Sequence, residues 1–332
     1  MKYVQLGGRR VSAIGLGTWQ FGSAEWGWGA DFGPADARAV VERALEVGVS
    51  FFDTAEIYGR GRSEEILGAA LREAGSEAMV ASKVWPTRMT AQAVVDAAER
   101  SRDRLGRATI DLYQIHWPNP LAPLSWTMAG MRRLLSQGTI GAVGVSNFSL
   151  GQWRRSERVL GQAVVSNQVH YHLLRRSPED VLLPYAAGLG RTIIAYSPLA
   201  QGFLAATHSG RSPRIPVREW NSLFDPRAIQ KAEPLFQALR SVAAEHGATS
   251  AQVALAWTIR DGNVIAIPGA RRPHQVEENT AAADIELTAD QVDRLERAAD
   301  SFRLPRRMQW TGLANAALRA VVYRASKVRR RA

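Results

Sequence analysis

The sequence contains no cysteine. This absence excludes disulfide frameworks, thiolate nucleophiles and thiolate metal sites. Long apolar segments are also missing: no apolar run approaches the ~20 residues that a membrane-spanning helix needs, and the first ten residues lack the apolar region of a signal peptide. With 46% hydrophobic and 22% charged residues the composition is that of an ordinary globular chain, and we expect a cytoplasmic protein.

Acidic residues are missing from the C-terminal tail, residues 301–332. Nine of the 42 basic residues lie there, which leaves 33 basic and 31 acidic residues in 1–300, so the net charge of +11 comes mainly from the tail. Apolar residues between 313 and 323 give the tail an amphipathic character. It is either an interfacial helix in weak contact with anionic lipid or, as we favour, a solvated basic end. Nucleic-acid binding is not expected, because no such motif accompanies the charge.

Short apolar runs alternate with longer amphipathic ones through residues 1–300. Eight of the short runs are rich in β-branched residues and bounded by turn residues, as buried strands are. They span residues 11–17, 48–53, 78–83, 110–116, 140–147, 164–170, 192–197 and 263–269. Amphipathic segments predict helices at 34–48, 63–75, 90–106 and near 126–138. Eight strands alternating with helices predict a (β/α)8 TIM barrel.

Two segments depart from this alternation. Before the first barrel strand, YVQL and RRV flank Gly7 and Gly8, which predicts an N-terminal β-hairpin. Residues 199–225 are rich in Gly, Pro and Ser and lack periodicity, so we expect a long loop there and a helix near 226–246. We therefore assign residues 1–300 to one barrel domain and treat the tail as a C-terminal extension.

The segment FFDTAEIYG, residues 51–59, places Asp53 at the end of a buried strand and Tyr58 five residues later. Each has an ordinary explanation when taken alone, since Asp is common in turns and Tyr often packs with a solvated hydroxyl. Lys83 and His116 also stand at the ends of apolar runs. Because the strand C-termini of a TIM barrel share one mouth, we expect all four side chains to converge there.

These four residue types suit proton transfer to a carbonyl oxygen while hydride reaches the carbon. A phenol titrates near ~10 in water, so an adjacent ammonium, Lys83, is expected to lower the pKa of Tyr58. Asp53 would keep Lys83 charged in a buried site. His116 would hydrogen-bond the carbonyl and orient it.

Hydride must come from a bound nicotinamide or flavin, because protein side chains cannot supply it. The chain has neither a GxGxxG nor a Walker A motif, so the cofactor is held in another way. Tyr196 follows an apolar strand and could stack on a flat cofactor ring. Ser146, Asn147 and Gln168 could hydrogen-bond a carboxamide.

A phosphate site is expected where the turn at Gly269 opens a helix in IPGARRPHQVEEN, residues 267–279. Backbone N–H groups and the side chains of Arg271 and Arg272 would face the phosphate together. Two arginines favour a cofactor with a 2′-phosphate, hence NADP(H). The alternative is a solvated arginine pair at a helix start.

Together these motifs resemble the aldo-keto reductase superfamily. The resemblance rests on GLGTWQFG, FFDTAEIYGRGRSEEILG, SKV, DLYQIHWP, GVSNFS, AYSPLAQG and IPGARRPHQVEEN, in that order over about residues 3–300. The nearest branch contains bacterial sugar and polyol dehydrogenases and potassium-channel β-subunits. The resemblance implies a (β/α)8 barrel, NADP(H) bound across its mouth, no metal, and a catalytic tetrad of Asp53, Tyr58, Lys83 and His116 with Tyr58 as general acid and base.

The resemblance also implies which residues line the cofactor. They are Trp19, Ser146, Asn147, Gln168, Tyr196, Ser197, Leu199, Gly202, Gly269, Arg271, Gln275, Glu278 and Asn279. The chain departs from the branch at Thr207, near the place where a lysine often reaches the cofactor phosphates. We therefore expect one phosphate contact to be missing. The family pattern gives no guide to the tail.

Four tryptophans, Trp26, Trp28, Trp85 and Trp117, fall in loops that could line a substrate pocket. Such walls suit an aromatic or other flat, partly apolar carbonyl compound, although sugars also stack on tryptophan. The HYH segment at 170–172 could suggest a metal, but no third ligand stands at a useful spacing, so none is expected.

Two functions are compatible with these residues. The first is an NADP(H)-dependent oxidoreductase that reduces aldehydes or ketones to alcohols, or catalyses the reverse, with a small carbonyl or alcohol as its partner. The second is a redox-sensing or partner-binding subunit that holds NADP(H) tightly and turns over slowly, as the likeness to channel β-subunits suggests. Cofactor exchange and turnover rate distinguish the two.

Overall fold

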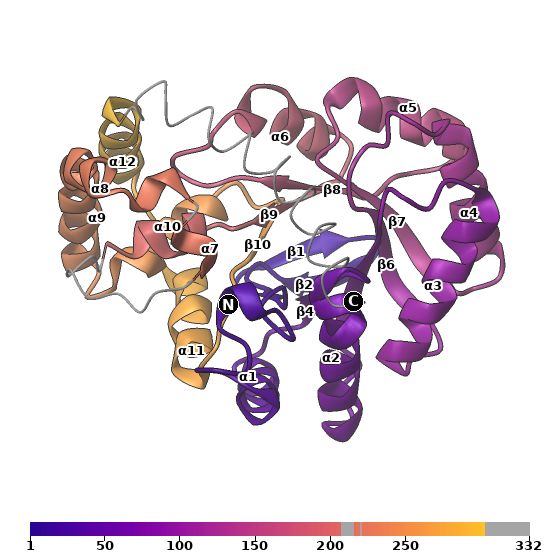
Figure 1. Ribbon diagram of the computed structural model, residues 1–332. Helices are drawn as coiled ribbons and strands as arrows, with labels where there is room; N and C mark the ends of the chain where they lie inside the picture. Colours follow the sequence, from indigo (N-terminus) through magenta and orange to yellow (C-terminus); the bar gives the residue numbers. More distant parts are fainter. Residues whose placement is uncertain (207–215, 220, 303–332) are drawn as a thin grey trace, which may run out of the picture.

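The computed structural model describes residues 1–206, 216–219 and 221–302. Eight parallel strands form one sheet in the order β10, β9, β8, β7, β6, β5, β4, β3, and helices surround it (Figure 1). Bridges from Ile14 to Ala266 and from Gly17 to Gly269 join the two edges of the sheet. The predicted (β/α)8 barrel is therefore confirmed. Its strands are β3 (Leu16–Gly17), β4 (Phe51–Asp53), β5 (Met79–Val84), β6 (Ile110–Ile115), β7 (Ile140–Ser146), β8 (Ser166–His170), β9 (Thr192–Tyr196) and β10 (Val264–Ile267).

Helices follow the strands along the chain and pack on the outside of the barrel (Figure 1). Capping fixes several of their ends: the Thr90 hydroxyl accepts the N–H of Ala93 at the start of α3, and Gly106, with φ of 62°, ends it. The α-helices are α1 (Pro34–Glu46), α2 (Arg62–Glu73), α3 (Ala91–Leu105), α4 (Leu124–Ser136), α5 (Leu150–Leu160), α6 (Pro178–Gly188), α7 (Pro216–Glu219), α8 (Pro226–Lys231), α9 (Glu233–Glu245), α10 (Ser250–Thr258), α11 (Pro273–Ala281) and α12 (Ala289–Ser301). Short 3-10 helices are η1 (Ala24–Trp26), η2 (Tyr58–Gly61), η3 (Ala200–Ala205), η4 (Ser222–Phe224) and η5 (Ala282–Asp284).

Two apolar cores follow from the alternation of side chains along each strand. In β4, Phe52 belongs to the core between sheet and helices, whereas Phe51 belongs to the core inside the barrel. The predicted hairpin, β1 (Tyr3–Leu6) and β2 (Arg9–Ser12), contributes Leu6 and Val11 to the inner core. It lies near the strand starts, where Thr192 donates to the Gln5 carbonyl. The hairpin therefore covers the opening opposite the strand C-termini.

Three predicted elements differ from the structure. The strand expected at 11–17 shrinks to Leu16–Gly17, since its first residues belong to β2. The helix expected near 226–246 is divided into α8 and α9, because Pro234 lacks an N–H and starts a new helix in its first turn. The loop expected at 199–225 contains η3, α7 and η4 among its described residues.

The predictions for the tail and for Thr207 lie outside the described residues, apart from Ser301 and Phe302. Across the described ranges, no helix is both long and apolar enough to traverse a bilayer.

Candidate active site

The four predicted catalytic residues stand at the C-terminal ends of three neighbouring strands. Asp53 is the last residue of β4, Lys83 lies near the end of β5, and His116 follows β6. Tyr58 begins η2, in the loop that continues from β4. Because β4, β5 and β6 are parallel and adjacent, their ends meet at one edge of the barrel.

Lys83 connects this group. Its Nζ donates to Asp53 Oδ1 at 2.5 Å, to the Thr54 carbonyl at 2.8 Å and to the Tyr58 hydroxyl at 3.3 Å. These three acceptors match the three N–H donors of an ammonium. The Lys83 side chain is 0% exposed and that of Asp53 2% exposed. Burial lowers the pKa of Lys83, and the Asp53 charge opposes this shift.

Asp53 is held by two further side chains. Its Oδ2 accepts from Gln168 Nε2 at 2.7 Å and from Gln114 Nε2 at 3.3 Å. Gln168 was predicted to bind the cofactor, and it also fixes the carboxylate that pairs with Lys83. Gln114 was missed by the sequence analysis. Its one available signal is a polar residue inside an apolar strand, two positions before His116.

Tyr58 carries the hydroxyl that contacts Lys83. Burial, followed by the Asp53 charge, raises the pKa of Tyr58 well above its usual range. The net direction is therefore opposite to the one expected, because burial and the Asp53 charge outweigh the lowering expected from Lys83. The phenol keeps its proton at neutral pH, which suits a proton donor.

The His116 ring packs edge-on against the Tyr58 ring, with ring centroids 5.7 Å apart. Its backbone N–H is bonded to the Val84 carbonyl, while its buried Nδ1 has no hydrogen-bond partner among the described residues. Burial, followed by the Lys83 charge, lowers the pKa of His116 well below its usual range. The imidazole is therefore neutral at neutral pH.

Aromatic rings surround the Tyr58 and His116 pair. Trp85 packs edge-on against His116 at 5.2 Å, and Trp19 stacks on Tyr58 at 6.2 Å. Trp26 packs on Trp19 at 5.2 Å. The structure therefore brings three tryptophans to the tetrad, including Trp19, which was predicted only as a cofactor residue.

The other two predicted pocket tryptophans are placed differently. Trp28 packs on Phe32 and against the outer core, away from the ring contacts of the tetrad. Trp117 follows His116 and is 43% exposed, so it lies at the outer edge of the mouth.

Next to the tetrad, the ends of β7, β8 and β9 bring together four predicted cofactor residues. The Tyr196 hydroxyl donates to Asn147 Oδ1 at 3.0 Å. Asn147 Nδ2 donates to Ser146 Oγ at 2.9 Å and more weakly to the His116 carbonyl at 3.4 Å. Asn147 has a φ of 61°, a left-handed conformation that Asn tolerates better than most residues. These contacts join the Tyr196 ring to the strand that carries His116.

An arginine that the sequence analysis missed, Arg218 of α7, lies beside Gly202. Its Nε donates to the Gln201 carbonyl at 2.9 Å, and a Cβ at Gly202 would collide with its guanidinium. Burial lowers the pKa of Arg218, and the nearby Arg271 charge lowers it further. The Arg271 charge is therefore near enough to act on Arg218. The Arg271 guanidinium donates to the Trp26 carbonyl at 3.3 Å, and none of the ion pairs found within the described ranges involves Arg218 or Arg271.

Other predicted cofactor residues close the turn before α11. Gln275 Oε1 accepts the backbone N–H groups of Arg271 at 2.8 Å and Arg272 at 3.2 Å. The Arg272 guanidinium pairs with Asp36 of α1. In this structure those two N–H groups are thus bonded to Gln275 and the Arg272 guanidinium to Asp36, and the phosphate site at this turn stays a prediction.

The remaining predicted residues are placed as follows. Ser197 (φ 49°) and Leu199 lie in the segment just after β9. A Cβ at Gly269 would collide with the Gln20 side chain. Glu278 accepts from the Thr249 hydroxyl at 2.7 Å, and Asn279 is buried in α11. Within the ranges that the structure describes, no group of three His, Asp or Glu side chains could hold a metal ion.

Comparison with known proteins decides the family. The Aldo/keto reductase family matches residues 13–300. The chain belongs to this family. An uncharacterized oxidoreductase of Mycobacterium tuberculosis is 49% identical over 304 residues, covering 91% of this chain and 94% of the relative.

Solved structures of aldo-keto reductases and related dehydrogenases share the fold. An aldo/keto reductase from Klebsiella pneumoniae in complex with NADP and acetate is 31% identical, with a TM-score of 0.73, covering 92% of this chain and 96% of that one. A glycerol dehydrogenase from Gluconobacter oxydans is 28% identical, with a TM-score of 0.82, covering 92% and 98%. The chain is thus an oxidoreductase with the aldo/keto reductase fold.

Proposed function

We propose that this aldo/keto reductase uses NADP(H) to reduce aldehydes or ketones to alcohols, or to catalyse the reverse, with Tyr58 as proton donor. One observation carries the proposal: Lys83 contacts both the Asp53 carboxylate and the Tyr58 hydroxyl at the barrel mouth. The Tyr58 oxygen accepts from Lys83, so its own proton is directed elsewhere and is available to a substrate oxygen.

The cofactor supplies hydride when bound, and the residues around the mouth fit its chemistry. Tyr196 offers a ring face and Asn147 an amide, as a nicotinamide with its carboxamide requires. Arg218 and Arg271, close together and unpaired with carboxylates in the described ranges, fit an anionic group such as a phosphate. The Klebsiella relative crystallised with NADP supports this choice of cofactor.

Arg218 also bears on the phosphate contact expected to be missing at Thr207. Its guanidinium lies beside Gly202, near the place on the chain where the branch often has a lysine. A cation is therefore present on this side of the mouth, supplied from α7 instead of from position 207. We propose that Arg218 and Arg271 bind the same anionic group of the cofactor.

Each residue of the tetrad then has its own role in the reaction. Tyr58 donates its proton to the carbonyl oxygen, and Lys83 stabilises the negative charge left on the phenol. Asp53 keeps the buried ammonium charged. His116, which is neutral because its pKa is lowered, hydrogen-bonds the carbonyl oxygen and orients it. Trp19, Trp85 and their neighbours suit an aromatic or flat, partly apolar carbonyl substrate.

The test is steady-state oxidation of NADPH by purified protein with an activated aromatic aldehyde, followed by nicotinamide absorbance, with NADH alongside. We expect turnover that prefers NADPH. Tight NADPH binding without turnover would contradict the proposed enzyme and favour the slow redox sensor.

A further inference from the structure

The Tyr196 ring is supported from behind by a second ring. His170, the last residue of β8, stacks on Tyr196 with ring centroids 5.0 Å apart and planes 16° apart. The Tyr196 hydroxyl is fixed at the same time by Asn147 Oδ1 at 3.0 Å. One face and one edge of the ring are thus held, and the opposite face is where the proposed function requires a flat ligand.

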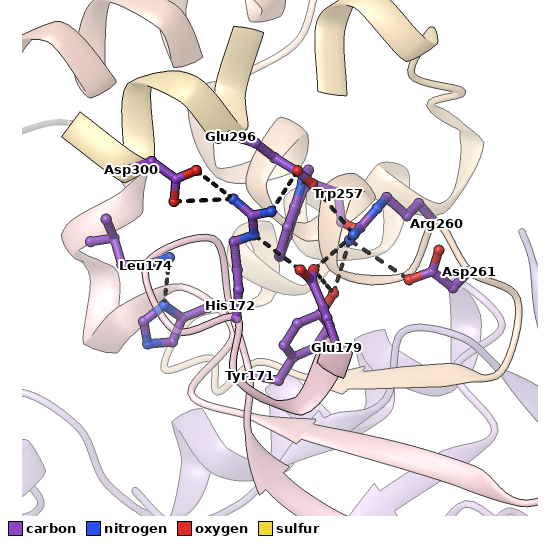
Figure 2. A network of polar contacts seen from close by, with 10 residues as sticks. Tyr171, His172, Leu174, Glu179, Trp257, Arg260, Asp261, Glu296 and Asp300 are labelled. Carbon is purple, nitrogen blue, oxygen red and sulfur yellow. Dashed lines mark hydrogen bonds and ion pairs between the residues drawn. The ribbon is translucent and has the colours of Figure 1, made fainter. Parts of the chain in front are cut away.

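His170 is itself held by His172. The Nε2 atoms of His170 and His172 are 3.0 Å apart. On the other side of the His172 ring, the backbone N–H of Leu174 donates to His172 Nδ1 at 3.2 Å (Figure 2). Because an accepting Nδ1 carries no proton, the neutral His172 ring is protonated on Nε2 and donates to His170 Nε2. His170 is then protonated on Nδ1.

Both imidazoles are uncharged at neutral pH, as this hydrogen bond requires. Burial, followed by the Arg175 charge, lowers the pKa of His170 to about 3. Burial, followed by the charges of His170 and Arg175, lowers the pKa of His172 well below its usual range.

The loop that carries His172 is fixed from its other side by a network of ion pairs (Figure 2). Glu179 of α6 accepts from Tyr171 at 2.8 Å and pairs with Arg260 at 2.8 Å and with Arg176 at 3.0 Å. Arg176 continues to Glu296 of α12 at 2.7 Å. The network connects the loop that carries His172 to α6, α12 and the segment just after α10, so contacts with several helices hold this loop.

We infer that His170 is a positioning residue: its ring holds Tyr196 flat against the nicotinamide, and His172 fixes the orientation of that ring. The inference rests on the proposed function, since it needs a nicotinamide on the face of Tyr196 opposite His170. It assigns a role to the HYH segment that requires no metal.

Three substitutions of His170 separate the ring from the hydrogen bond. His170→Ala removes both, His170→Gln keeps an acceptor for His172 without a ring, and His170→Phe keeps a ring without an acceptor. Tyr185→Ala is the matched control, because it removes one ring of a comparable pair with Trp153, whose centroids are 5.2 Å apart, away from the mouth.

The measurement is the dissociation constant for NADPH, by quenching of protein fluorescence, with the KM for NADPH and the kcat for an aromatic aldehyde. Loss of one aromatic pair predicts a dissociation constant raised roughly 2- to 10-fold for the Ala and Gln variants, and a smaller change in kcat. His170→Phe should restore most of the affinity, and Tyr185→Ala should match the wild type. Equal affinity of wild type and His170→Ala, or equal weakening by all three substitutions, overturns the inference.

Two further results complete the test. Wild-type protein that binds no NADPH overturns both the proposed function and this role of His170. NADPH binding that is the same in wild type and His170→Ala overturns only the role of His170. Long-range proton–nitrogen correlation spectra of the imidazoles, which need no cofactor, should show His172 protonated on Nε2 and His170 on Nδ1. The opposite pair of tautomers would contradict the arrangement in which His172 orients His170 and His170 holds Tyr196.

Discussion

The Lys83 Nζ lies 3.3 Å from the Tyr58 hydroxyl oxygen, and the same nitrogen lies 2.5 Å from Asp53 Oδ1. The proposed acid is thus linked to a buried carboxylate through one ammonium. Removal of the Asp53 or Lys83 charge therefore changes the electrostatic field at the other two groups, and we expect this coupling to shape the pH dependence of activity.

Replacing Asp53 by Asn should move the alkaline limit of activity to lower pH. Burial lowers the pKa of Lys83 and the Asp53 charge raises it, so loss of that charge lowers the pKa further. The ammonium then loses its proton at a lower pH than in the wild type. The measurement is kcat/KM for carbonyl reduction between pH 6 and 10, and an alkaline limb that stays in place or moves upward would contradict the role of Asp53.

The acidic side of the same pH profile should show no step near ~6.5, the ordinary titration range of histidine. Burial and the Lys83 charge hold the pKa of His116 well below that value, so the imidazole remains neutral as the pH falls through 6.5. Wild type and His116→Gln, which keeps a hydrogen-bonding amide, are compared between pH 5 and 8. A wild-type step near 6.5 that is absent from the variant would show that His116 works in its protonated form.

Arg218→Met and Arg271→Met should each weaken NADPH binding by roughly 10-fold or more, because a charge-assisted hydrogen bond contributes about 1.5–3 kcal/mol. Arg272→Met is the matched control, since that guanidinium pairs with Asp36 and should change the KM for NADPH little. Titrations with NADH show which phosphate is involved: an effect confined to NADPH assigns the arginines to the 2′-phosphate. Unchanged NADPH affinity in both variants would remove them from the site.

Glu179 should stabilise the fold only above its titration range. Burial alone would raise its pKa, but hydrogen bonds from Arg260, Tyr171 and Arg176 hold the pKa of Glu179 below its ordinary value. A depressed carboxyl pKa contributes stability above the unfolded value, ~4.3, and that contribution disappears as the pH falls through the folded pKa.

Glu179→Gln should therefore lower the Tm by a few degrees at pH 7, and the difference from wild type should shrink below about pH 4. The check is thermal unfolding from pH 3 to 7, with the exposed Glu65→Gln as a control that should stay at the wild-type Tm. A Tm difference that does not depend on pH would contradict the ionic role of Glu179.

The barrel and the convergence of Asp53, Tyr58, Lys83 and His116 at its mouth could be predicted from the sequence, because both depend on local patterns. Asp53, Lys83 and His116 each end an apolar run, and a parallel barrel brings all such ends to one mouth. Gln114 and Arg218 could not be placed in the same way. Gln114 lies within a strand, and Arg218 returns to the mouth from α7 after an irregular segment, so their partners depend on tertiary packing.

Local sequence patterns also could not predict which charged side chains pair with one another. Arg271 and Arg272 are neighbours in the chain, yet only packing of α1 against α11 shows that Arg272 is used by Asp36. The direction of the Tyr58 pKa likewise depends on burial, which the sequence does not state. Hydrophobic periodicity fixes which residues face inward, but not which charges meet there.

The most direct test of the account is a single-turnover reduction of an aromatic aldehyde by protein saturated with NADPH, comparing wild type with Tyr58→Phe. Nicotinamide absorbance reports hydride loss, and fluorescence quenching reports cofactor binding. We predict unchanged NADPH binding and a reduction rate lower by roughly 10²- to 10⁴-fold, the usual contribution of a positioned general acid. A Tyr58→Phe rate within about tenfold of the wild type would contradict the assignment of Tyr58 as proton donor.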